Sequence, residues 1–399
     1  MVVKIEKLDN LGRGICYIDN KICFIEKALP EDELEIKITK EKSKYLEGEI
    51  VKIINASPIR KESTCPYFNT CGGCQYLNID YKDEIKVKNN SFKEIIQKYA
   101  GINSNIIKDI NSIDKNNYRN KVTFHVKDRI LGFYKYNSNE LIEIDCCLLL
   151  DEEINKVIPV LKEYVKSEQV EIIIIKCSND SKEKMIELFG NINNTKSLEK
   201  YFDVIVVNNN EITSENYINT KILDINYSLK KDAFFQVNKY LTNKLYMNVI
   251  DYLKKVKAKN VLDLYCGVGA ISLAISKYVD KVIGIEINEA AIKSAKITAK
   301  NNNISNVEFI CNSVEKEKEI FNNIDTVIVD PPRSGLNKTL INSILKNNIK
   351  NLIYISCNPI TLARDLKLLE EEYKATEIVP YNMFLHTYHL ESITVLERK

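Results

Sequence analysis

The hydrophobic and polar positions divide the chain into three stretches with different periods. From residue 222 onwards, short apolar runs typical of buried strands alternate with amphipathic segments of helical period. Strands that alternate with helices in this way indicate a doubly wound sheet, so we expect 222–399 to form one α/β domain. The predicted strands are VLDLY (261–265), KVIGIE (281–286), VEFI (307–310), DTVIVD (325–330), NLIYIS (351–356) and two last strands near 375–381 and 391–397, and the predicted helices cover 239–256, 270–278, 288–301, 337–347 and 360–371.

Residues 1–57 show a shorter rhythm of five β-like runs separated by glycine, asparagine and proline. Five short strands at this spacing predict a small OB-like β-barrel. The order of LGRG (11–14) and ALPEDELEIKI (28–38) within these runs resembles the TRAM domain, an OB-like barrel found on RNA-modifying proteins. The five runs are VVKIEKL, GICYI, KICFIEKAL, ELEIKITK and LEGEIVKII.

Residues 58–221 mix both periods and predict a central α+β domain. A helix is expected at about 78–100, where it is placed to pack on the C-terminal domain. The stretch 115–136 interleaves basic with aromatic residues, a combination that can hold phosphates and stack bases. The same pattern also fits the solvated face of an ordinary sheet. On the first interpretation, Arg119 and Lys121 are candidate RNA contacts.

The start of the central domain carries a cysteine cluster within CPYFNTCGGCQY. Cys65, Cys71 and Cys74 are spaced C-x5-C-x2-C, and two glycines let the backbone fold so that the last two thiolates can point at one centre. The nearest downstream candidates for a fourth ligand are Cys146 and Cys147. Four cysteines suit tetrahedral zinc or a four-iron cluster, and the spacing does not choose between them. The C-x3-C-x2-C pattern of radical S-adenosylmethionine enzymes is absent.

The first strand of the C-terminal domain runs into a glycine loop, DLYCGVGA (263–270). Asp263, Gly267 and Gly269 form a D-x3-G-x-G pattern in which the glycines allow a ligand to approach the backbone. Glu286 ends the next strand, where an acid can hydrogen-bond ribose hydroxyls. The loop lacks the third glycine of the dinucleotide fingerprint and resembles the methyltransferase loop for S-adenosylmethionine.

A later strand ends in DPPR (330–333). Its two prolines rigidify the turn and hold the Asp330 carboxylate towards the crevice, where it could accept a hydrogen bond from an N–H of a base. Methyltransferases of this fold that act on amino groups usually have N-P-P-aromatic here. Asp330 and Arg333 therefore argue against amino-group chemistry.

LIYISCNP (352–359) places Cys357 at the carboxyl end of a buried strand. Most free cysteines are small core residues, but the glycine loop, Asp330 and Glu391 favour a nucleophile. Carbon 5 of uracil is too weak a nucleophile to take a methyl group directly. Addition of a thiolate to carbon 6 overcomes this, and a base such as Glu391 then removes the proton from carbon 5. His386 and His389 are alternative bases.

Taken together, these motifs resemble the RNA (uridine-5-)-methyltransferase family over nearly the whole chain, specifically its TRAM-bearing, iron–sulfur 23S rRNA branch. The motifs are CPYFNTCGGCQ, YRNK, FFQVN, DLYCGVGAISL, DPPRSG, YISCNP and HTYHLES. The resemblance implies S-adenosylmethionine as methyl donor and an RNA whose target base is extracted into the pocket. It also implies Cys357 as nucleophile, Glu391 as base, Asp330 against the uracil, a four-iron cluster on Cys65, Cys71, Cys74 and Cys147, and a cofactor site that includes Gln236, Tyr265, Glu286 and Asp330.

One motif departs from the family pattern. Many relatives carry an adenine-contacting acid after the VEFI strand, whereas this chain has CNSVE (311–315), so Asn312 or Ser313 takes that role or the role is unfilled.

Composition sets outer limits on the function. A net charge of +2 means that RNA is held by local patches. The sequence starts without an apolar leader and contains no run of about 20 apolar residues, so we expect a cytoplasmic protein. In that reducing compartment, its eleven cysteines suggest metal binding or catalysis before disulfides. We expect a monomer that does not contact membranes. The rival hypotheses are methylation of transfer RNA by the same chemistry, and a non-catalytic RNA-binding protein with a zinc-bound cysteine cluster.

Overall fold

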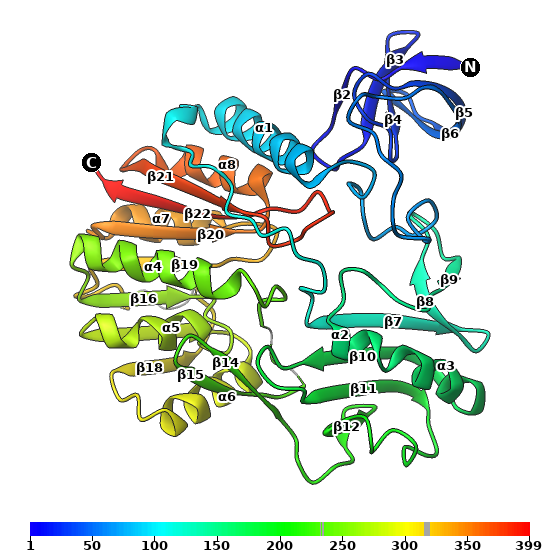
Figure 1. Cartoon of the computed structure of the whole chain (residues 1–399). Helices are drawn as coiled ribbons and strands as arrows, with labels where there is room; N and C mark the ends of the chain where they lie inside the picture. The colour runs from blue at the N-terminus through cyan, green and yellow to red at the C-terminus, as the bar shows by residue number, and fades with distance from the viewer. Residues whose placement is uncertain (232, 234, 315–319) are drawn as a thin grey trace.

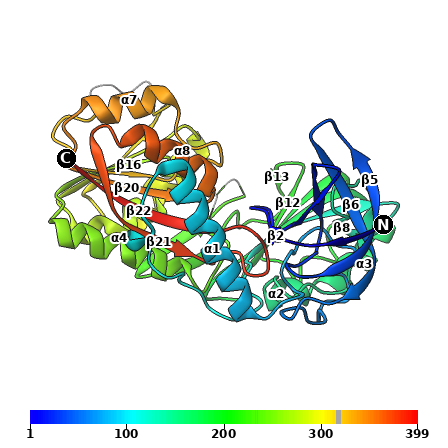
Figure 2. The same ribbon diagram turned by 90° about the horizontal axis from the view of Figure 1, so that it is seen from above.

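The computed structural model describes residues 1–231, 233, 235–314 and 320–399 and contains three larger sheets and one hairpin (Figure 1). Three residues of or beside the predicted motifs lie outside the described residues. They are Phe234 of FFQVN, Asp232 shortly before it, and Glu315 of CNSVE. Viewed from above, the C-terminal sheet with its helices lies on one side, and the N-terminal and central sheets lie on the other (Figure 2). No helix in the described ranges is long and apolar enough to cross a membrane.

The C-terminal sheet has the strand order β18-β17-β16-β19-β20-β22-β21. The first five strands in this order are parallel, and β22 runs antiparallel to both of its neighbours. This confirms the doubly wound sheet predicted from the sequence. Its strands are β16 (Asn260–Leu264), β17 (Lys281–Glu286), β18 (Val307–Cys311), β19 (Thr326–Val329), β20 (Asn351–Ser356), β21 (Tyr373–Tyr381) and β22 (Glu391–Arg398).

Helices cover both faces of this sheet because its strands are apolar on both sides. In β20, Leu352 and Tyr354 pack with the cluster that includes α1, α7 and α8, whereas Ile353 and Ile355 pack with α4, α5 and α6 on the other face. The helices are α4 (Thr242–Val256), α5 (Ala270–Ile275), the short 3-10 helix η2 (Ser276–Tyr278), α6 (Glu289–Asn301), α7 (Lys338–Lys346) and α8 (Pro359–Leu369).

The N-terminal sheet has six strands in the order β1-β5-β6-β4-β3-β2. The expected five-stranded barrel is wrong on two points: the first run breaks into two strands, and the edge strands β1 and β2 do not pair, so the sheet is not closed. The break lies at Ile5 and Glu6: the N–H of Ile5 donates to the backbone oxygen of Asp32, just before β5, and the N–H of Glu6 donates to that of Ile15 in β3. The strands are β1 (Val2–Lys4), β2 (Lys7–Leu8), β3 (Gly14–Ile18), β4 (Lys21–Ile25), β5 (Glu33–Glu41) and β6 (Tyr45–Asn55).

The central region contains a second seven-stranded sheet, ordered β13-β12-β11-β10-β7-β8-β9, and the hairpin β14-β15, which crosses the expected boundary at 221. Helix α1 packs along α8 of the C-terminal domain (Figures 1 and 2). The elements are α1 (Tyr81–Ala100), η1 (Ser104–Ile106), β7 (Lys121–Lys127), β8 (Ile130–Tyr134), β9 (Leu141–Glu143), α2 (Glu152–Asn155), α3 (Ile158–Ser167), β10 (Gln169–Cys177), β11 (Lys184–Asn191), β12 (Val204–Val207), β13 (Asn210–Glu211), β14 (Ile218–Ile222) and β15 (Ile225–Leu229).

Candidate active site

Sheet topology brings the predicted reactive residues to one edge. The parallel strands β16, β17, β19 and β20 end side by side, and the carboxyl ends of such strands are where doubly wound folds bind ligands. Cys357 follows β20 directly, and Glu391 begins the antiparallel neighbour β22. Because Ser356 is paired with Ser392, the antiparallel register places Cys357 and Glu391 opposite each other at the end of the ladder.

The Cys357 thiol is half-buried just before α8. Burial, together with the charges of Glu391 and Asp330, raises the pKa of Cys357 to about 11, and Arg333 opposes this rise. Asn358 shapes the turn: its side chain accepts a hydrogen bond from the N–H of Ile360 at 3.1 Å and so caps α8.

The Glu391 carboxyl is only 3% exposed. Burial raises its pKa well above the ordinary value, Asp330 adds to the rise, and Arg333 opposes it. A carboxylate with a raised pKa is a stronger base than an exposed one, so this environment suits proton removal.

The two histidines differ from the expected alternative bases. His386 Nδ1 lies 3.0 Å from the carboxylate of Glu84, and its Nε2 lies 3.2 Å from Asn116 Oδ1. His389 Nε2 lies 3.3 Å from an Arg333 nitrogen. Burial, with nearby cations, lowers the pKa of His389 to about 4, so its ring is neutral at neutral pH. Both rings are therefore engaged with protein groups.

The glycine loop borders a cavity of about 50 Å³. Asp263 is fully buried there, and burial raises its pKa to about 7. Ser272 donates a hydrogen bond to one of its carboxylate oxygens, whereas the other has no hydrogen-bond partner within the described part of the chain. An unpaired buried oxygen is costly and marks the place where a polar ligand group would bind. The cavity is also lined by Phe235, Gln236, Tyr246, Tyr265, Cys266, Gly267, Val268, Ala270, Ile271 and Asp330.

The backbone of this loop is shaped for a close ligand. Tyr265, Gly267 and Gly269 all have positive φ, at 65°, 55° and 75°. A Cβ atom at Gly267 would meet nothing within 4 Å, so this turn is open, whereas one at Gly269 would lie 2.5 Å from the Phe309 ring. The N–H of Gly267 donates to the Glu286 carboxylate at 3.2 Å, which joins the loop to the end of β17.

Other residues predicted to bind the cofactor lie near this loop. Asp330 is partly exposed, and burial together with Asp263 raises its pKa to about 7. The N–H of Asn312 donates to the backbone oxygen of Glu286 at 3.1 Å, and the N–H of Ser313 donates to the Asn312 side chain at 2.8 Å. The CNS run thus lies next to the end of β17.

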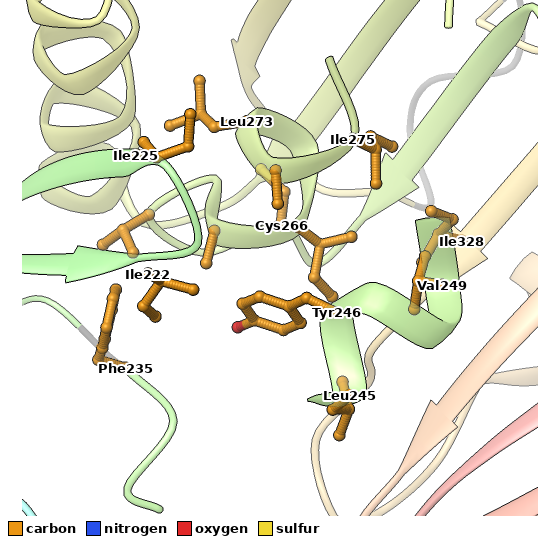
Figure 3. Packing of buried hydrophobic residues seen from close by; sticks show 14 of the residues in the cluster. Ile222, Ile225, Phe235, Leu245, Tyr246, Val249, Cys266, Leu273, Ile275 and Ile328 are labelled. Carbon is orange, nitrogen blue, oxygen red and sulfur yellow. The ribbon is translucent and has the colours of Figure 1, made fainter. Parts of the chain in front are cut away.

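Sequence reasoning missed Tyr246 of α4. Its ring points from α4 into the region around Cys266 and Phe235 (Figure 3) and lines the cavity. Burial raises the pKa of Tyr246 well above its ordinary value, and the charges of Asp330, Asp263 and Glu391 add to the rise. The apolar period of the helix indicated a core residue, and no sequence signal distinguished Tyr246 from its neighbours.

The predicted RNA contacts lie outside this cavity. Arg119 donates from Nε to the backbone oxygen of Lys121 at 3.0 Å, and Lys121 begins β7 of the central sheet. The backbone of Arg119 bridges to Leu150 of the central region and to Asn238, just before α4, so Arg119 lies between the central region and the C-terminal domain.

The clustered cysteines line a second cavity, of about 440 Å³, to which Arg119 also contributes. Burial raises the pKa of Cys65, of Cys74 well above the ordinary value, and of Cys147 to about 11. Cys146 lines the cavity as well but is exposed. Across the described ranges, no group of three or more His, Cys, Asp or Glu side chains has the arrangement that holds a single metal ion.

Comparisons with known proteins agree with this architecture. Residues 180–399 match the family described as tRNA (Uracil-5-)-methyltransferase, and residues 1–51 match the TRAM domain. An uncharacterized RNA methyltransferase of Clostridium acetobutylicum is 32% identical over 99% of this chain and 96% of its own length. Another, from Fusobacterium nucleatum, is 34% identical over 100% of this chain and 95% of its own length.

A solved structure extends the likeness to the whole fold. The Pyrococcus abyssi tRNA (uracil-54, C5)-methyltransferase in complex with S-adenosyl-L-homocysteine has a TM-score of 0.82 at 24% identity, with 99% of this chain and 100% of that chain covered. The fold and the cavity at its carboxyl edge define a methyltransferase of the S-adenosylmethionine-dependent class. The chain belongs to the tRNA (uracil-5-)-methyltransferase family, with an N-terminal TRAM domain, and is an RNA methyltransferase.

Proposed function

We propose that this enzyme methylates carbon 5 of a uridine in RNA through a covalent adduct between Cys357 and carbon 6. The observation that carries the proposal is the register of β20 and β22, which sets a thiol opposite a buried carboxylate at the cofactor edge of the sheet. Glu391 is only 3% exposed, and a carboxyl group buried to this extent costs stability, which supports a role for it in the reaction.

The residues divide the reaction into steps. Because its pKa is raised, Cys357 starts as a protonated thiol. As sulfur bonds to carbon 6, the thiol proton passes to Asp330, whose pKa is raised to about 7, so that Glu391 is left for the proton of carbon 5. When bound, S-adenosylmethionine supplies the methyl group for carbon 5. Glu391 then removes the proton from carbon 5, and the double bond re-forms as the Cys357 sulfur leaves carbon 6. Asp330, at the end of β19, accepts a hydrogen bond from the uracil.

In this proposal, the cofactor binds at the glycine loop, with part of it entering the small cavity there. The unpaired oxygen of Asp263 and the open turn at Gly267 leave polar and backbone groups ready for a ligand. In this proposal, Glu286 binds the ribose hydroxyls and Asn312 or Ser313 lies against the adenine. The remaining contacts come from Gln236, Tyr265, Gly269 and Asp330.

We further propose that the cysteine cavity holds a [4Fe-4S] cluster. The supporting observation is that Cys65, Cys71, Cys74 and Cys147 all line one cavity, of about 440 Å³, and four thiolates are the ligand set of such a cluster. Cys147 is favoured over Cys146 as the fourth ligand because its side chain is the less exposed. Such a cluster would fix the loop that carries Cys65, Cys71 and Cys74.

The proposed substrate is 23S rRNA, because the TRAM domain and the cysteine set together mark that branch of the family. Transfer RNA is a second candidate. The Pyrococcus abyssi tRNA (uracil-54, C5)-methyltransferase matches this chain over its full length, so the N-terminal domain is compatible with a tRNA substrate as well.

The test is methylation of rRNA and tRNA isolated from cells that lack 5-methyluridine, with nucleoside mass spectrometry and position mapping. The wild-type enzyme is expected to form 5-methyluridine in one RNA class. Cys357→Ala should form none while it still binds S-adenosylmethionine, and Cys16→Ala, which removes a cysteine of β3 in the N-terminal sheet, serves as the control. Full activity of Cys357→Ala would contradict the mechanism.

A further inference from the structure

Helix α1 carries a buried ion pair that has no part in the chemistry described above. Glu84 and Lys88 lie one turn apart with their charged atoms 2.9 Å from each other, and their side chains are 0% and 2% exposed. The comparable pair on α6, Glu289 and Lys293, is about 70% exposed and therefore ordinary. Two charges withdrawn from water are costly unless further hydrogen bonds compensate them, so the partners of this pair identify its task.

Those partners lie in the loop 382–390, which joins β21 to β22. The Glu84 carboxylate accepts hydrogen bonds from the backbone N–H of His386 at 2.9 Å and from the side chain of Asn382 at 3.2 Å, and His386 Nδ1 lies 3.0 Å from it. Lys88 donates to the Asn382 side chain at 2.6 Å and to the backbone oxygen of Phe384 at 3.1 Å. Both charges thus hold the same loop.

The electrostatics agree with a fixed, fully ionised carboxylate. Burial alone would raise the pKa of Glu84, but Lys88 and His386 lower it to about 2. Burial lowers the pKa of Lys88, and the Glu84 carboxylate opposes that change. Because the carboxylate is compensated by donors from its own helix and from the loop, removing the loop contacts would leave it short of partners.

The loop needs this support because its own backbone is irregular. His386 has a φ of 65°, an uncommon conformation for a residue other than glycine. Its backbone oxygen accepts from the N–H groups of Gln75 at 2.8 Å and Tyr76 at 3.1 Å, which directly follow the cysteine loop. Tyr118 donates to the oxygen of Leu385 at 3.2 Å. Four separated segments of the chain therefore meet at the residues that lead into Glu391.

We propose that Glu84 is a positioning residue for Glu391: together with Lys88 it fixes the loop 382–390 and so holds the base where it can reach carbon 5. This inference rests on the proposed function, in which Glu391 removes that proton. Helix α1 belongs to the central region, so the cysteine-bearing part of the chain helps to build the base side of the catalytic domain.

The proposal predicts a defect in one step only. Formation of the Cys357 adduct and binding of the cofactor use groups on β16, β17, β19 and β20, whereas breakdown of the adduct needs Glu391. A displaced base should therefore slow breakdown, so that methylated adduct accumulates. Misplacement of a catalytic group by about 1 Å can cost on the order of 100-fold in rate.

Two variants weaken the contact between α1 and the loop 382–390, one by changing the helix and one by changing the loop. Removing one partner of a buried pair leaves an unpaired charge and threatens folding, so Glu84→Leu is combined with Lys88→Met, which removes both charges together. His386→Asn leaves the pair intact, removes the ring contact on the loop side and tolerates the positive φ. The control is Glu289→Gln with Lys293→Met on the exposed pair of α6.

The experiment measures single-turnover adduct formation and decay on denaturing gels, together with S-adenosylmethionine affinity. In both variants we expect adduct decay and kcat to fall by about 10- to 100-fold, with adduct formation and cofactor affinity unchanged, and the control should match wild type. Wild-type adduct decay in a folded double variant overturns the proposal. If the double variant does not fold, His386→Asn decides, and wild-type decay there overturns it.

Glu391→Gln separates this proposal from the proposed function. If Glu391→Gln fails to trap an adduct, the assignment of the base is wrong and the positioning role falls with it. If Glu391→Gln traps the adduct and the Glu84 and His386 variants behave as wild type, only the positioning role is wrong.

Discussion

At the residue scale, the same burial that weakens Cys357 as a free thiolate strengthens Glu391 as a base. A protonated thiol is protected from alkylation and oxidation until the substrate arrives. The disadvantage is that the Cys357 thiol must lose its proton for the adduct to form. The reactivity of Cys357 therefore depends on the presence of the uracil.

The thiol gives a direct pH prediction. Because burial raises the pKa of Cys357 to about 11, its thiolate fraction is small at neutral pH and grows about tenfold with each pH unit. Alkylation of the Cys357 peptide by iodoacetamide, followed by mass spectrometry in the ligand-free enzyme, should rise in this way towards pH 11. A plateau near pH 8 or 9 would contradict the raised pKa.

Asp263 gives a second prediction, on stability. Burial raises its pKa from 3.8 to about 7, so between these values the unfolded chain has released a proton that the folded chain keeps. The free energy of unfolding contributed by Asp263 therefore falls as pH rises from about 4 to about 7, by on the order of 4 kcal/mol. Urea unfolding of Asp263→Asn should show a gain over wild type that grows across this window. A gain that stays constant with pH would contradict the assignment.

Much of the site could be predicted from residue types at strand ends, because strand ends meet in a doubly wound sheet whatever the details. Cys357, Asp330 and the glycine loop were found in this way. Tyr246 and Glu84 were not, because both lie on helices whose period already explains an inward-facing side chain. What makes them special is the tertiary contact, which the sequence does not display.

At the element scale, the turn between β16 and α5 contains two glycines with different roles, one in folding and one in cofactor binding. Gly269 has a φ of 75° and its Cβ position lies 2.5 Å from the Phe309 ring, whereas Gly267 has a φ of 55° with open space beside it. Each glycine therefore has a different reason for lacking a side chain.

Alanine at these two positions should have different effects. Gly269→Ala combines backbone strain on the order of 1–2 kcal/mol with a clash in the core and should lower the melting temperature strongly. Gly267→Ala carries only the strain, keeps the fold and loses S-adenosylmethionine affinity because its methyl group occupies the open turn. Calorimetry of unfolding and of cofactor binding checks both. Equal loss of stability in the two variants would contradict this division.

Elements were predictable where the hydrophobic period was long and regular, as in every strand and helix from β16 to β22. The prediction of strands failed where the choice of pairing partner decides where a strand begins or ends. The run VVKIEKL splits into β1 and β2 because Ile5 and Glu6 donate to different strands, at Asp32 before β5 and at Ile15 in β3. The strand β11 was missed because Lys184 and Glu187 interrupt its apolar positions.

At the scale of the whole molecule, the cysteine cavity and the catalytic edge are joined through α1 and the loop 382–390. Through these contacts, the cluster proposed above could affect a reaction that it does not touch. It also makes metal content a property that can be tested separately from catalysis.

We predict that anaerobically purified enzyme is brown and contains about four iron atoms per chain. Cys65→Ala, Cys71→Ala, Cys74→Ala and Cys147→Ala should each lose iron and visible absorbance. Cys146→Ala is the matched control and should keep both, because its side chain is exposed. A colourless protein with one zinc, or iron loss in the Cys146 variant but not the Cys147 variant, would contradict the assignment.

The central claim is that Cys357 bonds to the uracil that becomes methylated, and peptide mass spectrometry tests it most directly. Glu391→Gln is incubated with RNA and S-adenosylmethionine, denatured, and digested with nuclease and protease. The account predicts a methylated uridine nucleotide attached to the peptide that contains Cys357. Formation of 5-methyluridine by the wild-type enzyme, with the Cys357 peptide unmodified in the variant, would contradict it.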